Sequence, residues 1–413
     1  MTTAIDDSGT VAATDESITM IAGQRATSLD YFRGMLLVIS AIVWLASPAL
    51  HEWPQNAVFN FLAGQFGPSI WHGVTLYDLL VPGFLFVAGI STAKSVARRK
   101  SDGQTKSAIL SHLIKRCLML LFMGIVLGNL SLPAWSDIRW LGVLQRIGIC
   151  QLAVGTLCLV ADRTIQLVVA SIVLVNYGIA FDAFAMAPPA TASQRQVAQT
   201  IDPYSVEYNI AAQIDKTWLP GRKYQGNWDA QGILTTLPAF VITLCGAILN
   251  GALFWRTGPG KEASSNRSVL VVSVVMVPAS LILDHFVQPM NSYLLTPAFV
   301  LIAVGVCGIV MVVFSRLATA ATTRSNSDSL IGSGRHGTIA GFGRNSLLMA
   351  VLLSVSSHII PNVFPYIERT FAIAVSYPWT LIAIWAGTLL WFCGRFLVCA
   401  MCSVHVYDRS INK

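Results

Sequence analysis

Ten long apolar segments constrain this chain more than any other feature. Each approaches the roughly 20 residues that a helix needs to cross a bilayer, and short polar connections separate most of them. In lipid, a helix can bond all its backbone polar groups internally. The sequence therefore predicts an all-α, polytopic membrane helix bundle of about ten transmembrane helices. The segments lie near 32–50, 74–93, 114–131, 140–161, 164–184, 232–254, 268–287, 293–315, 342–360 and 374–400.

The composition agrees with a membrane protein. Only 11% of the 413 residues are charged, whereas soluble domains have about a quarter. The net charge of +7 does not indicate a nucleic-acid partner, because the basic residues lie between apolar segments. The eight cysteines lie in or at the ends of these segments. This placement argues against a disulfide framework, and no spacing indicates zinc.

The distribution of Lys and Arg predicts the orientation. If the N-terminal tail and alternate loops share one side, that side holds all but seven of the 27 basic residues. The positive-inside rule then places both termini in the cytoplasm. We expect a disordered tail over 1–24, a membrane domain over 25–405 and a cytoplasmic tail over 406–413. The loop 185–228 would face outward, as an interfacial aromatic belt or as a lid.

Several polar side chains fall in the outward half of the predicted bundle. Asp78 lies inside the second span and Arg146 inside the fourth, while His72 precedes the second. A charged group at membrane depth is costly unless it faces protein or water, and it often marks a functional site. Asp78 and Arg146 could instead form a structural ion pair. Other polar residues expected at this depth are Asp229, Asp284, His285, Gln288, Asn291 and His358.

A second polar set occurs at the cytoplasmic end of the first span. It contains Arg25, Ser28, Asp30 and Arg33, and the basic segment 94–100 lies on the same side. Two interpretations are open: a site for a phosphate-bearing ligand, or contact with anionic lipid headgroups.

These segments resemble a known family. Ser28-Leu-Asp-Tyr-Phe-Arg-Gly34 looks like the opening motif of membrane acyltransferases. The segment from Trp71 to Phe86, with its Trp-His-Gly-x-Thr-x-x-Asp pattern, resembles the second-span motif of the heparan-α-glucosaminide N-acetyltransferase family. Three further segments are similar to motifs of that family, in the same order: Gly142-Val-Leu-Gln-Arg-Ile-Gly148, Asp229-Ala-Gln-Gly-Ile-Leu-Thr-Thr-Leu-Pro238 and Gly343-Arg-Asn-Ser-Leu347.

The resemblance implies acetyl-coenzyme A as acyl donor, entering from the cytoplasm, and a sugar-like polar acceptor on the far side. It also implies an integral protein of a bacterial inner membrane, in contact with lipid. The assigned candidates are Arg33, Asp30, Asn291 and Asn345 for cofactor binding, and His72, Asp78 and Arg146 for catalysis, with Arg146 and Asn291 as oxyanion donors.

The chain departs from the family at two expected catalytic positions. The family's asparagine aligns with Trp44 and its histidine with Pro68. His72 or His51 could replace that histidine as general base. Three functions therefore stay open: an acyltransferase, a transporter or flippase, and an inactive relative acting as a scaffold. The sequence leaves the oligomeric state open, a homo-oligomer included.

Overall fold

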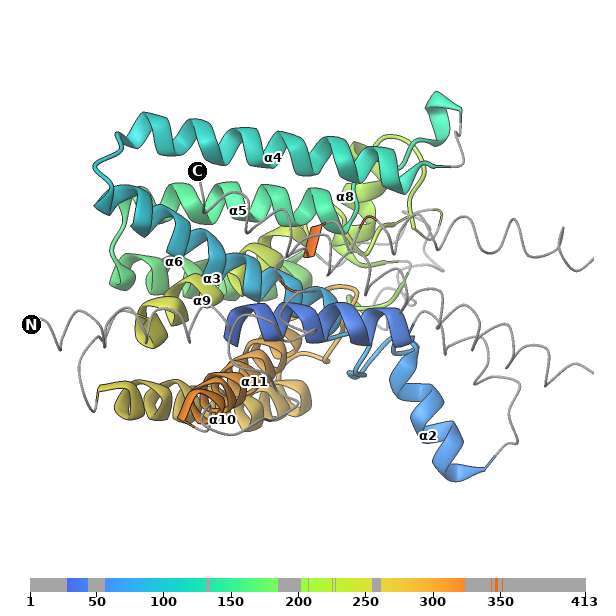
Figure 1. The fold of residues 1–413 in the computed structure, drawn as a ribbon. Helices are drawn as coiled ribbons and strands as arrows, with labels where there is room; N and C mark the ends of the chain where they lie inside the picture. The colour runs from blue at the N-terminus through green and yellow to red at the C-terminus, as the bar shows by residue number, and fades with distance from the viewer. Residues whose placement is uncertain are drawn as a thin grey trace, which may run out of the picture.

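The computed structural model describes residues 28–43, 56–130, 134–184, 202–206, 208–224, 226, 228–254 and 261–323, with 343, 346, 347 and 351. Within these ranges all regular structure is helical (Figure 1). The helices cover 28–43, α2 (Ala57–Phe66), α3 (Leu80–Ser101), α4 (Lys106–Gly128), α5 (Val143–Val160), α6 (Arg163–Ala183), α8 (Ile210–Trp218), α9 (Thr236–Phe254), α10 (Lys261–Phe286) and α11 (Pro297–Thr323), with a 3-10 turn, η1 (Trp135–Asp137).

Six of the described helices are long and apolar enough to cross a membrane: α3, α4, α5, α6, α10 and α11. A shorter apolar stretch, Thr236–Asn250, lies in α9. The prediction of an all-α polytopic membrane bundle is therefore confirmed. The predicted spans 342–360 and 374–400 lie almost wholly outside the described residues, as do the tails 1–24 and 406–413.

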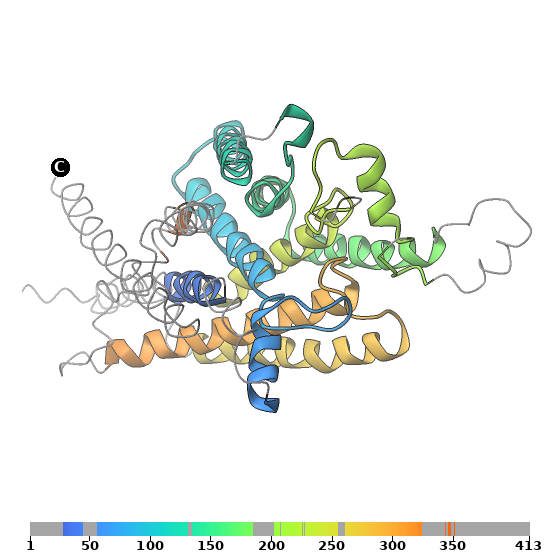
Figure 2. The same ribbon diagram turned by 90° about the vertical axis from the view of Figure 1, so that its right-hand side faces the viewer.

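The bundle is built around α3. This helix packs on α5 and α9, while α4 packs on α5 and α10 packs on α11. Figures 1 and 2 show the α4–α5 pair at one edge and the α10–α11 pair at the opposite one, with α3 and α9 between them. About two thirds of the spanning part of α3 (67%) is buried, against 17% for α10. The apolar face of α10 is thus available to lipid.

Two glycines let α3 and α9 approach closely. A Cβ atom on Gly89 would overlap the carbonyl oxygen of Thr243, and one on Gly246 would overlap that of Phe86. The contacts are reciprocal, since each glycine faces the backbone of the other helix. Small residues at such crossings bring backbones into van der Waals contact, which is a main source of association in lipid.

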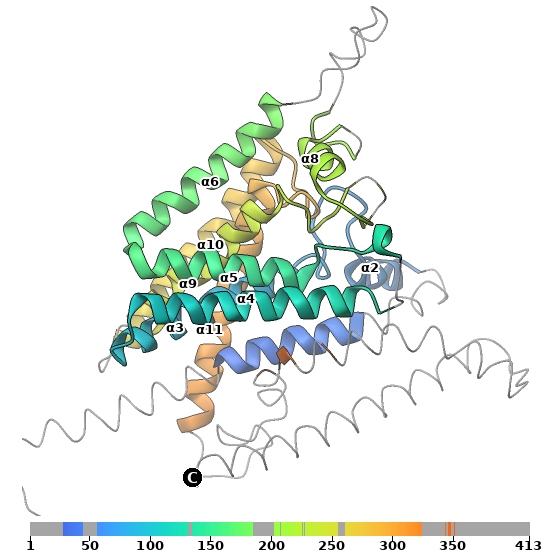
Figure 3. The same cartoon turned by 90° about the horizontal axis from the view of Figure 1, so that it is seen from above.

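The short helix α2 differs from the others in direction. It runs crosswise to the long helices, as Figures 1 and 3 show. Its side chains carry no charge, and Val58 and Phe61 are exposed. Backbone and amide groups of Gln65 tie it to the start of the second span, because its carbonyl accepts from Tyr77 N at 3.2 Å and its Oε1 from Leu76 N at 3.2 Å.

The crossing yields a first prediction. We expect Gly246→Ala to lower the stability of the bundle by about 1–3 kcal/mol, because a methyl group forces the two backbones apart. Gly64→Ala in α2 is the matched control, since nothing lies within 4 Å of the point where its Cβ atom would be. Thermal unfolding in detergent, followed by size-exclusion fluorescence, measures both. Equal melting temperatures for the two variants would contradict the close crossing.

Candidate functional site

Three segments meet at the end of the bundle that the sequence predicts to face outward, and they form what we call the outer cap: 67–79, 202–235 and 287–296. The Trp71 ring stacks on Tyr293, with centroids 5.5 Å apart, and meets Trp228 edge-on at 5.4 Å. The Trp71 indole donates to the carbonyl of Tyr204 at 2.7 Å. The tryptophan of the second-span motif therefore contacts all three segments of the outer cap.

Asp78 anchors the loop before α3. Its carboxylate accepts the backbone N–H of Ser69 at 3.2 Å and that of Thr75 at 3.1 Å, and the Thr75 hydroxyl lies 3.0 Å away. Asp78 is 8% exposed. A carboxylate satisfied by local donors needs no distant cation. The Thr-x-x-Asp spacing of the motif thus has a clear structural purpose.

Arg146 is buried in α5 and turns toward a different partner. Its Nη2 donates to the Thr235 hydroxyl and, at 3.4 Å, to the carbonyl of Gly232. Its Nε–H has no hydrogen-bond partner among the described residues. The alternative of an Asp78–Arg146 ion pair is therefore not realised. Instead, the guanidinium joins two family-like motifs, Gly142–Gly148 and Asp229–Pro238.

A second guanidinium, that of Arg139, binds the same segment, 229–235. Arg139 forms a two-pronged ion pair with Asp229, with Nε–Oδ2 at 3.0 Å and Nη2–Oδ1 at 2.7 Å. Asp229 also accepts the N–H groups of Tyr224 at 3.0 Å and of Gln231 at 2.9 Å. Charge-assisted, bidentate hydrogen bonds of this kind are stronger than hydrogen bonds between neutral groups. Asp229 is thus an architectural residue of the outer cap.

Asp215 is a buried carboxylate that the sequence reasoning missed. Its two oxygens accept the N–H groups of Asp229 at 3.2 Å and Ile233 at 2.9 Å. Burial raises the pKa of this carboxyl, while the two N–H donors act in the opposite direction. The helical spacing of Ala211, Ala212 and Asp215 carried the signal, because it places all three on the buried face of α8.

None of the remaining outward candidates among the described residues forms a hydrogen bond or ion pair with Asp78. His72 is exposed, and its ring meets that of Trp71 edge-on with centroids 6.4 Å apart. Pro68, at the position of the family's histidine, is also exposed, as is His285. His51, His358, Trp44 and Asn345 lie outside the described residues.

Asn291 lies in the outer cap, although the sequence analysis grouped it with cofactor residues. Its Oδ1 accepts the N–H groups of Tyr293 and Leu294, both at 2.9 Å. The residue is fully buried, and its Nδ2 has no partner in the described part of the chain. Asn291 is therefore not among the residues that surround Asp30 and Arg33, which lie at the end of the bundle predicted to be cytoplasmic.

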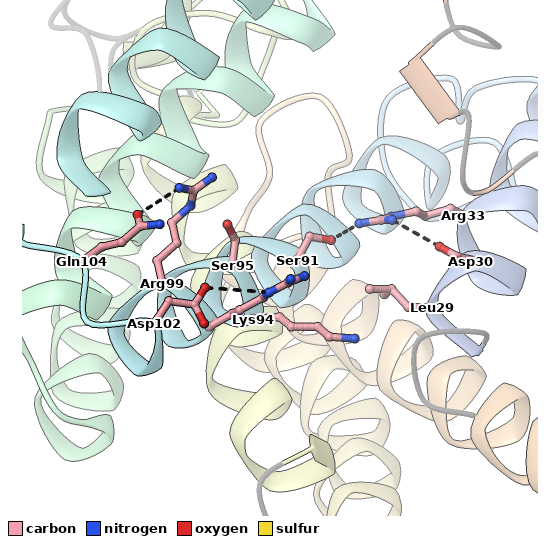
Figure 4. A pocket seen from close by; sticks show the side chains of 10 residues that line it. Leu29, Asp30, Arg33, Ser91, Lys94, Ser95, Arg99, Asp102 and Gln104 are labelled. Carbon is pink, nitrogen blue, oxygen red and sulfur yellow. Dashed lines mark hydrogen bonds and ion pairs between the residues drawn. The ribbon is translucent and has the colours of Figure 1, made fainter. Parts of the chain in front are cut away.

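The candidates at the end predicted to be cytoplasmic do come together. Asp30 and Arg33 line a cavity of about 440 Å³ with the last turns of α3 (Figure 4). Arg33 bonds to Asp30 at 3.4 Å and also donates to the Ser91 hydroxyl. The other lining residues are Leu29, Ser91, Lys94, Ser95, Arg98, Arg99, Asp102 and Gln104. We call this space the cytoplasmic cavity, after the orientation that the sequence predicts.

The last family-like motif reaches the same place. A Cβ atom on Gly343 would overlap the carbonyl oxygen of Asp30, so the backbone of residue 343 rests directly on the helix 28–43. Two motifs more than 300 residues apart thereby meet at Asp30, one of the residues that line the cytoplasmic cavity. The predicted cofactor residue Asn345 is two positions further on, outside the described residues.

The Asp215 contact generates a second prediction. A Cβ atom on Gly232 would overlap Asp215 Oδ2, so Gly232→Ala displaces a carboxylate that holds two backbone N–H groups. We expect a loss of about 1–3 kcal/mol in stability, measured by thermal unfolding. Gly67→Ala in the same cap is the control, because its nearest atom is an ordinary contact at 3.8 Å. An unchanged melting temperature for Gly232→Ala would refute this account.

Comparison with known proteins agrees with the motifs. No protein family model matches the chain. Over 143 residues the chain is 29% identical to heparan-alpha-glucosaminide N-acetyltransferase of Mus musculus. These residues make up 33% of this chain and 19% of that protein. The protein of the same name from Homo sapiens is 29% identical over 140 residues, 32% of this chain and 19% of the relative. The chain thus matches about a fifth of the length of these relatives, and the matches confirm its resemblance to the heparan-α-glucosaminide N-acetyltransferase family.

Proposed function

We propose that this protein is a membrane-embedded acyltransferase that moves an acetyl group from acetyl-coenzyme A to an amino or hydroxyl group of a sugar-like acceptor. The observation that carries the proposal is the cytoplasmic cavity, where two family-like motifs and the basic end of α3 meet. The relatives are named as N-acetyltransferases, which supports the same reaction class. By the predicted orientation, the donor enters from the cytoplasm and the acceptor from the outward side of a bacterial inner membrane.

The cavity suits the phosphate-bearing part of the donor. Arg33, Lys94 and Arg99 line a space of about 440 Å³, large enough for part of a nucleotide but not for a whole coenzyme. Arginine side chains bind phosphate through paired N–H donors. Asp30 holds the Arg33 guanidinium in place at 3.4 Å. Within this proposal, Arg33 binds the donor and Asp30 positions the Arg33 guanidinium. The thioester end of the donor extends into the bundle.

Acetyl transfer needs two further functions. The acceptor nitrogen or oxygen attacks the thioester carbonyl carbon, the carbon–sulfur bond breaks and the coenzyme leaves as a thiol. A base must take the acceptor's proton, and a donor must stabilise the oxyanion. The Nε–H of Arg146 lies inside the bundle without a partner among the described residues, so it can donate a hydrogen bond to the oxyanion. His72, exposed at the outer cap, is the proposed base.

Release of free thiol from acetyl-coenzyme A in proteoliposomes, with glucosamine as the probe acceptor, tests the proposal. We expect acceptor-dependent release from the wild-type protein. Arg146→Gln should lower kcat about 100-fold, with little change in donor binding, because it removes charge from the reacting carbonyl. Arg163→Gln, at the exposed start of α6, is the control and should keep full activity.

Absence of thiol release from the wild-type protein, with glucosamine and with other amino sugars, would favour the scaffold interpretation. Movement of the acceptor across the membrane without any thiol release would favour a transporter. Equal kcat values for Arg146→Gln and the wild type would remove Arg146 from the reaction while leaving the reaction class intact.

The proposed base has a separate test. We expect His72→Ala to lower kcat about 100-fold or more at neutral pH, without loss of stability, since the side chain is exposed and makes no hydrogen bond within the described structure. His285→Ala, another exposed outward histidine, should leave kcat unchanged. The thiol-release assay measures both variants. Comparable activity of the two would exclude His72 as the base and direct attention to His51.

A further inference from the structure

The cytoplasmic cavity has a basic group at each end. In Figure 4, Arg33 lies with Asp30 at one end and Arg99 with Gln104 at the other, with Lys94 and Ser95 between them. Helix α3 supplies half of the lining residues, because it contributes residues 91, 94, 95, 98 and 99 at helical spacing. The two ends are therefore suited to two separate anionic groups on one ligand.

The arginines of the cavity differ in how their charge is balanced. Arg33 faces the Asp30 carboxylate at 3.4 Å. Arg98 faces Asp102 at 4.0 Å, although both side chains are largely exposed. Arg99 instead makes its hydrogen bonds to an amide and an imidazole: Nη1 donates to Gln104 Oε1 at 3.0 Å, and Nη2 lies 3.1 Å from His112 Nε2. An amide carries no charge, and an imidazole accepts a hydrogen bond only when that nitrogen is deprotonated.

The fold holds the Arg99 guanidinium in one orientation. Gln104 reaches back because the turn after α3 returns its N–H to the Arg99 carbonyl at 3.1 Å, with Gly103 in the left-handed region at φ 72°. His112 approaches from α4. The guanidinium therefore keeps its positive charge, loses rotational freedom before any ligand arrives, and retains N–H donors beyond the two used here.

We propose that Arg99 is the binding residue for a phosphomonoester dianion in the cytoplasmic cavity. The inference rests on the proposed function for its choice of ligand: in coenzyme A this group is the 3′-phosphate, while the diphosphate lies toward Arg33 and Lys94. A dianion gains most from a cation that forms no ion pair with a carboxylate, and Arg99 forms none among the described residues. The Asp30 carboxylate makes the other end less positive. Arg99 would thus select the 3′-phosphorylated coenzyme, with Gln104 and His112 as positioning residues.

Binding of coenzyme A and of 3′-dephospho-coenzyme A, measured by isothermal titration on the intact chain in phosphatidylcholine nanodiscs, tests the proposal. We expect Arg99→Gln to weaken coenzyme A binding at least about 10-fold and to change dephospho-coenzyme A binding less than about twofold. Arg99→Lys keeps the charge but loses the paired donors, so its affinity for coenzyme A should lie between those of the wild type and Arg99→Gln. Arg98→Gln is the matched control: it removes the same charge from the cavity wall and should change the affinity for the two nucleotides by equal factors.

A phosphomonoester can also come from a lipid headgroup. Nanodiscs containing phosphatidic acid distinguish this source, because the lipid would compete with coenzyme A in the wild type and not in Arg99→Gln. Competition that depends on Arg99 supports the site and identifies the lipid as an occupant; no competition leaves the nucleotide as its ligand. Equal weakening of both nucleotides by Arg99→Gln, or no weakening of either, would overturn the inference.

The outcomes separate this inference from the proposed function. Selective, Arg99-dependent binding of coenzyme A without any thiol release would contradict the acetyltransferase and leave the phosphomonoester site standing. Thiol release that is equally fast with acetyl-dephospho-coenzyme A, in the wild type and in Arg99→Gln, would support the enzyme and refute the site.

Discussion

A charge inside a membrane bundle must find its hydrogen-bond partners within the protein, because lipid offers none. The outward half of this molecule is arranged around that requirement. The Arg146 guanidinium bonds to the turn that carries Gly232 and Thr235, and the same turn supplies N–H groups to Asp215 and Asp229. Arg139 then neutralises Asp229. The loop 202–235 of the outer cap is thus held by one continuous polar network, rather than by separate contacts.

The two ends of the bundle are built differently. At the outer cap, Asp78, Asp215 and Asp229 are almost fully buried and bonded to backbone N–H groups or to an arginine. At the opposite end, which is predicted to be cytoplasmic, basic side chains line an open cavity of about 440 Å³. Groups that are already satisfied stabilise a fold, whereas cations beside empty space can bind an anion. This contrast favours donor binding at the cytoplasmic end over any site confined to the cap.

The sequence predicted the helices well and the contacts poorly. Apolar length identified the spanning helices, because burial in lipid depends on composition. It also placed Asp78 inside the second span, whereas α3 begins at Leu80 and Asp78 lies in the turn before it. Asp78 instead satisfies its carboxylate within its own loop. Asp215 escaped notice because it lies on a short helix of the polar loop, outside the apolar pattern. The grouping of the basic residues near Arg33 was easier to predict, because these residues cluster in sequence as well as in space.

The anchoring of the second-span loop bears on the missing family histidine. Ser69 and Thr75 both donate backbone N–H groups to Asp78, and Trp71 fixes the loop against Tyr204 and Tyr293. These anchors involve neither Pro68 nor His72, which are exposed on the same loop. The shape of the loop therefore does not depend on which of the two positions carries an imidazole. Under the proposed function, a general base can move from one position to the other while the scaffold that presents it stays unchanged.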